Sequence, residues 1–211
     1  MPASSVGSRR RVILASASPA RLATLRAAGV DPEVIVSGVD ESDVDGFPAP
    51  EHALVLARRK ADHVAKSLAG RDDHPLVLGC DSVLELDGEV FGKPGSAEVA
   101  RERWRRMRGR TGVLHSGHCV VDVGTGRTAS GTASTVVRFA ALSDREIDAY
   151  VATGEPLAVA GGFTVDGLGG PFVTGVEGDY HNVVGVSLPL LRELLIELEV
   201  FWPDLWRSPV P

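Results

Sequence analysis

The apolar and polar positions along the chain predict short strands alternating with amphipathic helices. At the N-terminal side, residues 12–14 form an apolar run that suits a buried strand. Ser18 followed by Pro19 is a typical helix start, because proline fits the first helical position. Gly29 follows the last apolar position of this helix, where a left-handed terminal residue is expected. The sequence therefore predicts a strand, a tight junction and a helix in residues 12–29.

The same reasoning predicts the other elements. Further helices are expected at residues 51–68, 96–108, 143–154 and 189–198. Further strands are expected at residues 33–36, 76–80, 83–86, 90–91, 113–123, 128–139 and 172–176. The Asp87-Gly88 pair predicts a hairpin, and Ser143 with Glu146 forms the sequence pattern of a capping box.

Composition and charge narrow the class of protein. The chain has 211 residues, of which 44% are hydrophobic, and this suits one domain with a sizeable core. Its net charge of −6 argues against a general nucleic-acid or membrane-surface binder, since both need a basic face. We expect a loose terminus at residues 1–10, one domain at 11–200 and a tryptophan-containing tail at 201–211 that packs back on the domain.

The cysteines and the lack of targeting segments predict a cytoplasmic protein. Cys80 and Cys119 lie in apolar, strand-like runs without C-x-x-C spacing, so we expect buried free thiols in a reducing compartment. No apolar run approaches the roughly 18 residues of a transmembrane helix, and residues 1–11 lack the apolar core of a signal peptide.

Polar residues gather at the first strand-to-helix junction. Ser16, Ser18 and Arg21 would place two hydroxyls and a guanidinium beside the free N–H groups of a helix N-terminus. Such a group can cradle an oxyanion such as phosphate. The alternative is that Ser18 only caps the helix while Arg21 lies solvated on its surface.

Four charged residues at predicted element ends suggest phosphoryl-transfer chemistry. Asp81 follows the strand at 76–80, and the hairpin would fold Lys93 back toward it, while Glu41 lies in an acidic loop and Lys60 on a helix. Two carboxylates can bind a divalent cation or deprotonate water, and two lysines can neutralise phosphate oxygens. The alternative is a scatter of unrelated surface charges.

Other chemistries have less support. The chain has no G-x-x-x-x-G-K-[ST] motif, and its glycine-rich segment at 161–170 lacks the order of a dinucleotide-binding loop. His115 and His118 stand three residues apart in a predicted strand, so they would point to opposite faces. We expect each to make local hydrogen bonds rather than share a metal.

Several motifs together resemble one family, the Maf family of nucleoside triphosphate pyrophosphatases. The matching segments cover roughly residues 11–200 in the family's order, and they are L-A-S-A-S-P-A-R-L-A-T-L (14–25), V-D-E (39–41), L-A-R-R-K-A (56–61), G-C-D-S-V (79–83), G-K-P (92–94), G-E-P-L (154–157), A-G-G-F (160–163) and E-G-D-Y-H-N-V-V-G (177–185). Each motif alone is weak, but this many in sequence are specific.

The resemblance implies a hydrolase that cuts a nucleoside triphosphate to the monophosphate and pyrophosphate with a divalent cation, Mg²⁺ or Mn²⁺. It implies that Asp81 is the general base, that Lys60 and Lys93 hold phosphates and that Glu41 assists the metal or water. Glu41 and Asp81 would ligate the metal. The further residues implied to line the triphosphate site are Ser16, Ser18 and Arg21.

The resemblance also implies an elongated α/β fold, with a mixed sheet and two lobes around a central cleft, similar to inosine triphosphatase-like (Maf/Ham1) proteins. Members are often homodimers, and the implied role is to clear non-canonical or surplus nucleotides. Two alternatives stay open. One is a nucleotide-binding regulator of cell division or septum formation with little or no hydrolysis, and the other is a phosphatase that releases single phosphates.

Three departures from the pyrimidine-specific members leave the preferred base open. Ala20 replaces an arginine, Ser82 a threonine and Asp166 a glutamine. An acid can accept hydrogen bonds from the N1 and N2 donors of guanine but repels the acceptor-rich edge of a pyrimidine. Members that prefer 7-methylguanosine triphosphate also carry an acid there, but with tryptophan in place of Ala20. Gly112 and Val159 stand where the family usually has histidine and lysine.

Overall fold

The computed structural model describes residues 10–41, 44 and 46–207, and its centre is a seven-stranded mixed sheet. The strand order is β2-β1-β3-β5-β6-β7, with β4 paired to β3. The strands are β1 (Val12–Leu14), β2 (Glu33–Val34), β3 (Leu76–Leu86), β4 (Glu89–Phe91), β5 (Thr111–Asp122), β6 (Thr128–Phe139) and β7 (Val173–Glu177). β1 pairs in parallel with β2 and β3, and the other pairs are antiparallel.

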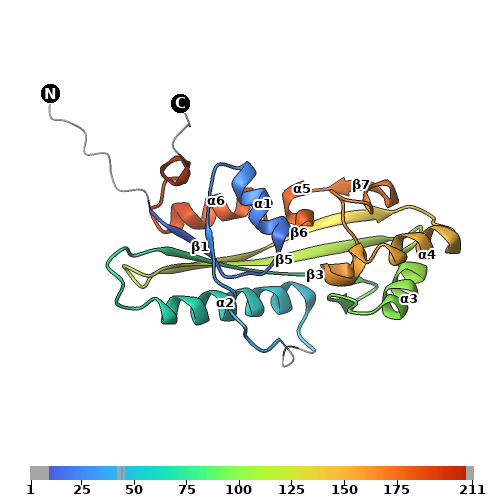
Figure 1. Ribbon diagram of the computed structural model, residues 1–211, viewed down its shortest axis with the longest axis horizontal. Coiled ribbons are helices and arrows are strands. Elements are labelled where there is room, and N and C mark those ends of the chain that lie inside the picture. Colours follow the sequence, from blue (N-terminus) through green and yellow to red (C-terminus); the bar gives the residue numbers. More distant parts are fainter. Residues whose placement is uncertain (1–9, 42–43, 45, 208–211) are drawn as a thin grey trace.

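Helices cover both faces of this sheet (Figure 1). They are α1 (Pro19–Ala27), α2 (Ala49–Ser67), α3 (Ala97–Met107), α4 (Asp144–Ala152), α5 (Tyr180–Val184) and α6 (Leu188–Glu197). In Figure 1 the long helix α2 runs along one face of the extended strands, while α1 and α6 lie on the opposite side. α3 and α4 lie together at one end of the elongated molecule.

A break in strand pairing sets the position of the site. On one edge of β3, β1 pairs with Leu76–Leu78 and β4 pairs with Leu84–Leu86. The other edge pairs with β5 from Leu76 to Glu85. The middle of β3, residues 79–83, therefore has no strand partner on the first edge among the described residues. This leaves a gap in the sheet between β1 and β4.

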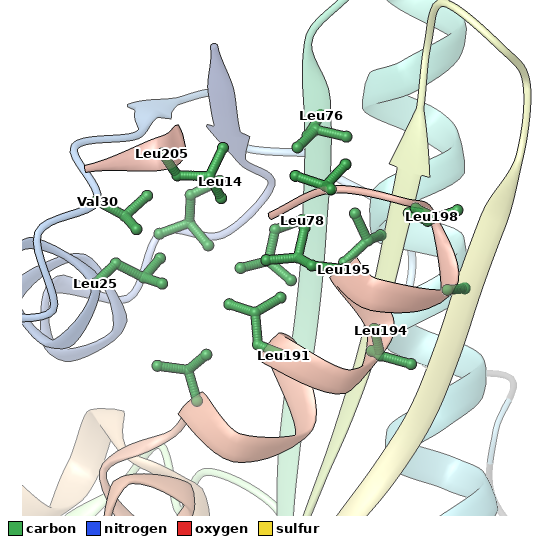
Figure 2. Packing of buried hydrophobic residues seen from close by; sticks show 14 of the residues in the cluster. Leu14, Leu25, Val30, Leu76, Leu78, Leu191, Leu194, Leu195, Leu198 and Leu205 are labelled. Carbon is green, nitrogen blue, oxygen red and sulfur yellow. The ribbon is translucent and has the colours of Figure 1, made fainter. Parts of the chain in front are cut away.

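The two-residue period of β3 decides which helix each side chain meets. Leu76 and Leu78 point to the core with α6, together with Leu191 and Leu195 (Figure 2). Val77, one residue on, belongs to the cluster packed on α2 instead. The alternation continues along the strand, so Asp81 is on the α2 side and Ser82 on the α1 side.

Two glycines allow α2 to lie unusually close to the sheet. A Cβ on Gly79 of β3 would stand 2.2 Å from the carbonyl oxygen of Ala57, and one on Gly117 of β5 would stand 2.2 Å from that of Ala53. Real Cβ atoms do not approach backbone oxygens so closely, so any other residue would displace the helix. This close packing brings Lys60 of α2 within reach of β3.

The structure confirms the predicted helices and corrects some strands. The segments predicted at 76–80 and 83–86 are one continuous strand, β3, and the strand predicted at 33–36 covers only Glu33–Val34. The tail contains a short 3-10 helix, Trp202–Leu205, and packs back as expected, because Leu205 is buried and Trp206 bridges to Val30.

The structure describes the predicted loose terminus only at Arg10 and the predicted tail only up to residue 207. Residues 1–9 and 208–211, which belong to the predicted loose terminus and tail, lie outside the described residues. Arg10, the last residue of that predicted terminus, pairs with Asp122 at 2.7 Å. In the part of the chain that the structure describes, every helix is too short or too polar to cross a membrane.

A buried histidine fastens α6 to the sheet and makes stability depend on pH. His118 donates from Nδ1 to the Ser116 carbonyl (3.0 Å) and accepts at Nε2 from the Ser187 backbone N–H (2.8 Å). Burial lowers the pKa of His118 from 6.5 to about 4. A lowered folded-state pKa stabilises the fold above pH 6.5, and this contribution is lost as pH falls toward 4.

We therefore expect the free energy of unfolding to fall between pH 7 and pH 5 by about 2 kcal/mol more in the wild type than in His118→Gln. Urea unfolding at the two pH values measures this difference. Subtracting the two proteins cancels the contribution of all other titrating groups. Equal pH dependence in both would contradict the assignment.

Candidate active site

A cavity of about 670 Å³ lies at the gap between β1 and β4. This volume lies within the range that small-molecule sites usually have. Ten predicted site residues line it, and they are Ser16, Ser18, Ala20, Arg21, Glu41, Lys60, Asp81, Ser82, Lys93 and Asp166. The structure therefore brings together every residue that the sequence suggested, and the alternative of scattered surface charges is wrong for this set.

Lys60 joins the two candidate catalytic carboxylates. Its Nζ lies 2.6 Å from Asp81 Oδ1 and 2.6 Å from Glu41 Oε1. Lys60 and Asp81 are buried, with 8% and 9% exposed, so this contact is shielded from bulk water. The second oxygen of Asp81, Oδ2, has no hydrogen-bond partner among the described residues. It is the atom available for a water molecule.

Charge and burial act in opposite directions on Glu41. Burial by itself would raise the pKa of its carboxyl, but the hydrogen bond from Lys60 and the charges of Lys60, Lys93 and Arg21 outweigh it. The pKa of Glu41 is therefore lowered, and its carboxylate stays ionised at neutral pH. The site thus holds two carboxylates and several cations in one cavity.

Lys93 provides a second ammonium group at the cavity. It follows β4, and the β3–β4 hairpin brings it back to the cavity as predicted. Lys93 is exposed, and no described residue forms a hydrogen bond or ion pair with its side chain. Its ammonium group can therefore meet an anionic ligand that enters the cavity.

The start of α1 supplies hydroxyl and backbone donors. Ser18 is the N-cap, with Oγ accepting from the Arg21 backbone N–H at 3.4 Å. Ser16 Oγ accepts from the Ser18 N–H (3.2 Å) and from Arg21 Nη1 (3.0 Å), which leaves its own hydroxyl proton available. The predicted cap and the predicted anion cradle therefore coexist in this segment.

Arg21 is buried and committed, so the alternative of a solvated surface arginine is wrong. Nε donates to the Gly185 carbonyl (2.8 Å), Nη1 to Ser16 and to the Cys80 carbonyl (2.9 Å), and Nη2 to Ser82 Oγ (2.9 Å). These bonds connect α1, α5 and the unpaired edge of β3. Most of the guanidinium donors hold the site together, and few remain for a ligand.

The three positions that depart from the pyrimidine pattern have different surroundings. Ala20 and Asp166 line the cavity, and Asp166 is exposed. Ser82 is buried, and its Oγ is engaged by Arg21 and by Ser116 Oγ at 2.8 Å. Asp166 therefore keeps a carboxylate for the ligand, whereas the hydroxyl of Ser82 already has protein partners.

The prediction that Asp81 follows the end of a strand is wrong. Asp81 does not stand at the end of its strand but in the middle of β3, and Lys60 stands in the interior of α2. Asp81 lines the cavity because β1 ends beside it before β4 begins. The sequence does not show that Asp81 lies inside a strand, because apolar residues stand on both sides of it and the length of the strand is not evident.

One wall of the cavity consists of residues to which the sequence patterns give no function. This wall contains Val159, Phe163 and Thr164, in and just before the glycine-rich segment, and Val183 and Gly185 from the end of α5. Phe163, Val183 and Gly185 lie in the family-like segments, and Val159 stands where the family usually has lysine. They are mostly apolar or backbone contacts, which carry no recognisable chemistry in a sequence.

Known proteins resemble this chain over most of its length. The family model described as Maf-like protein matches residues 11–198. The chain belongs to the Maf family. A relative from Salinispora tropica is 62% identical over 93% of this chain and 87% of its own length, and one from Streptomyces coelicolor is 57% identical over 94% and 95%. Both are named nucleoside triphosphate pyrophosphatase.

A solved structure also resembles this Maf-family chain. The Staphylococcus aureus Ham1 protein matches with a TM-score of 0.44 and 17% identity, over 63% of this chain and 73% of the other.

The carboxylate pair fits one kind of metal site. Among the described residues no group of three or more histidine, cysteine, aspartate or glutamate side chains is placed to hold a metal. Glu41 and Asp81 already share one cation, the Lys60 ammonium. Mg²⁺ is often bound by one or two carboxylates together with substrate phosphates and water. The donor set therefore fits a divalent cation that is shared with a phosphate ligand.

Proposed function

We propose that this Maf-family chain is a nucleoside triphosphate pyrophosphatase. It hydrolyses the bond between the α and β phosphates and releases a nucleoside monophosphate and pyrophosphate. The relatives' names support this activity. The observation that carries the proposal is the Glu41–Lys60–Asp81 contact, which lies in one cavity with Lys93 and the N-terminus of α1.

Each charged group has a defined role in the proposed reaction. Asp81 accepts a proton from water at Oδ2 while the water oxygen bonds to one phosphorus of the α–β anhydride. The bridging oxygen leaves with the other phosphorus. Lys60 holds Asp81 in place through the contact with Oδ1, and Lys93 neutralises phosphate oxygens as charge develops. The hydroxyls of Ser16 and Ser18 and the α1 N–H groups bind the rest of the triphosphate.

Glu41 and Asp81 would hold the divalent cation, Mg²⁺ or Mn²⁺, with phosphate oxygens completing its shell. When bound, this cation supplies further charge neutralisation to the phosphates. Arg21 acts mainly by fixing Ser16, Ser82 and the backbone before Asp81, because its donors are committed there.

The test is a panel of nucleoside triphosphates, including guanosine, methylated guanosine, inosine and pyrimidine forms, incubated with Mg²⁺ or Mn²⁺. Monophosphate and pyrophosphate as the sole products support the proposal. Release of single phosphates supports the phosphatase reading instead. Binding without cleavage supports the nucleotide-binding regulator of cell division. A cytoplasmic location, a homodimer and a role in clearing surplus nucleotides stay predictions.

Asp166 is proposed to read the base, and its replacement is expected to change selectivity. A carboxylate only accepts hydrogen bonds, as the N1 and N2 donors of guanine require, whereas an amide can also donate to a pyrimidine. In Asp166→Asn we expect the ratio of kcat/KM for guanosine over pyrimidine triphosphates to fall about tenfold. Steady-state kinetics on both classes measures it, and an unchanged ratio would remove Asp166 from base recognition.

A further inference from the structure

A carboxylate outside the cavity holds the loop that carries Asp166. Glu155 begins the 3-10 helix Glu155–Ala158 directly after α4, and it is not part of the cavity lining. Its Oε2 accepts from the Leu168 backbone N–H at 3.0 Å, and its Oε1 accepts from that of Gly169 at 3.1 Å. Oε1 also accepts from the Thr164 hydroxyl at 2.5 Å. The Glu155 side chain thus binds both ends of residues 164–169, here called the 164–169 loop.

Tyr150 fixes this carboxylate from the opposite side. Its hydroxyl donates to Glu155 Oε1 at 3.0 Å and accepts from the Thr164 backbone N–H at 3.2 Å. The tyrosine ring packs edge-on against Trp104 and Phe172, with ring centroids 5.5 and 5.3 Å away. The anchor of the 164–169 loop is therefore set in the aromatic core at the α3–α4 end of the molecule.

Two glycines let the loop backbone lie on the Tyr150–Glu155 pair. A Cβ on Gly167 would stand 2.6 Å from Glu155 Oε2, and a Cβ on Gly169 would stand 2.5 Å from the Tyr150 hydroxyl oxygen. Both distances are too short for a real Cβ, so larger residues would push the loop off its anchor. These contacts give a structural reason for two of the glycines in the glycine-rich segment.

Asp166 depends on this anchor for its position. It lies between Thr164 and Leu168, which the carboxylate of Glu155 holds at both sides. The side chain of Asp166 is exposed and makes no hydrogen bond or ion pair with any described residue. Its place at the cavity therefore depends on where the backbone of the loop lies.

We infer that Glu155 is a positioning residue that sets nucleobase selectivity by fixing the 164–169 loop and with it Asp166. This inference rests on the proposed function. Glu155 does not touch the ligand, because its acceptor positions are already occupied by loop and tyrosine donors. Small displacements of a recognition group weaken discrimination strongly, and such supporting contacts prevent them.

The experiment compares the wild type, Glu155→Ala, Asp166→Ala and the double variant on guanosine and pyrimidine triphosphates. In Glu155→Ala we expect the selectivity ratio of kcat/KM to fall about tenfold, with the larger part of the loss in KM. Because Glu155 acts through Asp166, adding Glu155→Ala to Asp166→Ala is expected to change the ratio no further. Glu155→Gln should restore part of the ratio, since its amide keeps one acceptor oxygen but replaces the other with an NH2 group that only donates.

Controls separate this positioning role from a general effect on folding. Asp148→Asn removes an exposed carboxylate of α4 that pairs with Arg101 at 2.8 Å, and it should leave the ratio unchanged. Circular dichroism shows whether Glu155→Ala folds. If it does not, Thr164→Val takes its place, because it removes one hydrogen-bond donor to Glu155. Its effect and that of Asp166→Ala on the ratio are likewise expected to be non-additive. Additive losses, or an equal loss for all bases, would overturn the inference. A wild type that cuts no triphosphate would instead defeat the proposed function.

Discussion

Asp81→Asn is expected to lower kcat/KM for the best triphosphate by about 10²–10⁴-fold, the range that a general base usually contributes. The asparagine keeps the size of the side chain but cannot take a proton from water. Lys60 retains Glu41 as a partner at 2.6 Å, so the fold should survive. Steady-state release of pyrophosphate, with thermal unfolding in parallel, measures both effects.

The matched control for this variant is Asp62→Asn. Asp62 is an exposed carboxylate of α2 and does not line the cavity. It should change neither kcat/KM nor the melting temperature appreciably. If Asp81→Asn keeps more than about a tenth of the wild-type rate, Asp81 is not the base. Water would then be activated by another group of the cavity.

Lys60→Met is expected to lower kcat/KM by about 10²–10³-fold, as loss of one preorganised charge-stabilising group commonly does. Methionine keeps the length and apolar stem of lysine but removes the ammonium that joins Glu41 and Asp81. Two neighbouring carboxylates then lack their shared counter-charge and repel each other. Kinetic measurements over pH 5–9 would show the effect.

The pH profile distinguishes this role from simple loss of packing. Burial raises the pKa of Glu41, and the contact with Lys60 is the main influence that lowers it. Without Lys60 that pKa rises, so the acidic limb of the rate profile should move to higher pH in Lys60→Met. Lys66→Met, at an exposed position of the same helix, should keep the wild-type profile. An unshifted acidic limb in Lys60→Met would contradict the electrostatic role.

Sequence signals between near neighbours predict most of the secondary structure. Ser18-Pro19, the Asp87-Gly88 turn and the Ser143–Glu146 capping box each depend on contacts within a few residues, and the structure contains all three. Short-range signals of this kind are visible in a sequence because the interacting groups are neighbours in the chain. The sequence predicts two strands where the structure has the single strand β3. The reason is that the polar pair Asp81-Ser82 looks the same in a sequence whether it lies inside a strand or ends one.

The candidate residues were found by residue type and family-like spacing, but their relations were not. Sequence patterns indicated Glu41, Lys60 and Asp81 as charged groups of interest. They could not show that one ammonium touches both carboxylates. That contact depends on the close approach of α2 to the sheet at Gly79. Such an approach involves atoms of residues far apart in the chain, so only the folded structure determines it.

The amino-acid order alone therefore specified the elements, the family and the inventory of charged groups. The tertiary structure decided where the cavity lies, because the gap between β1 and β4 arises from pairing over long sequence distances. It also decided that Arg21 is committed inside the protein and that Glu155 holds the loop of Asp166. Hydrogen-bond partners and burial depend on packing between distant segments, which hydrophobic periodicity does not encode.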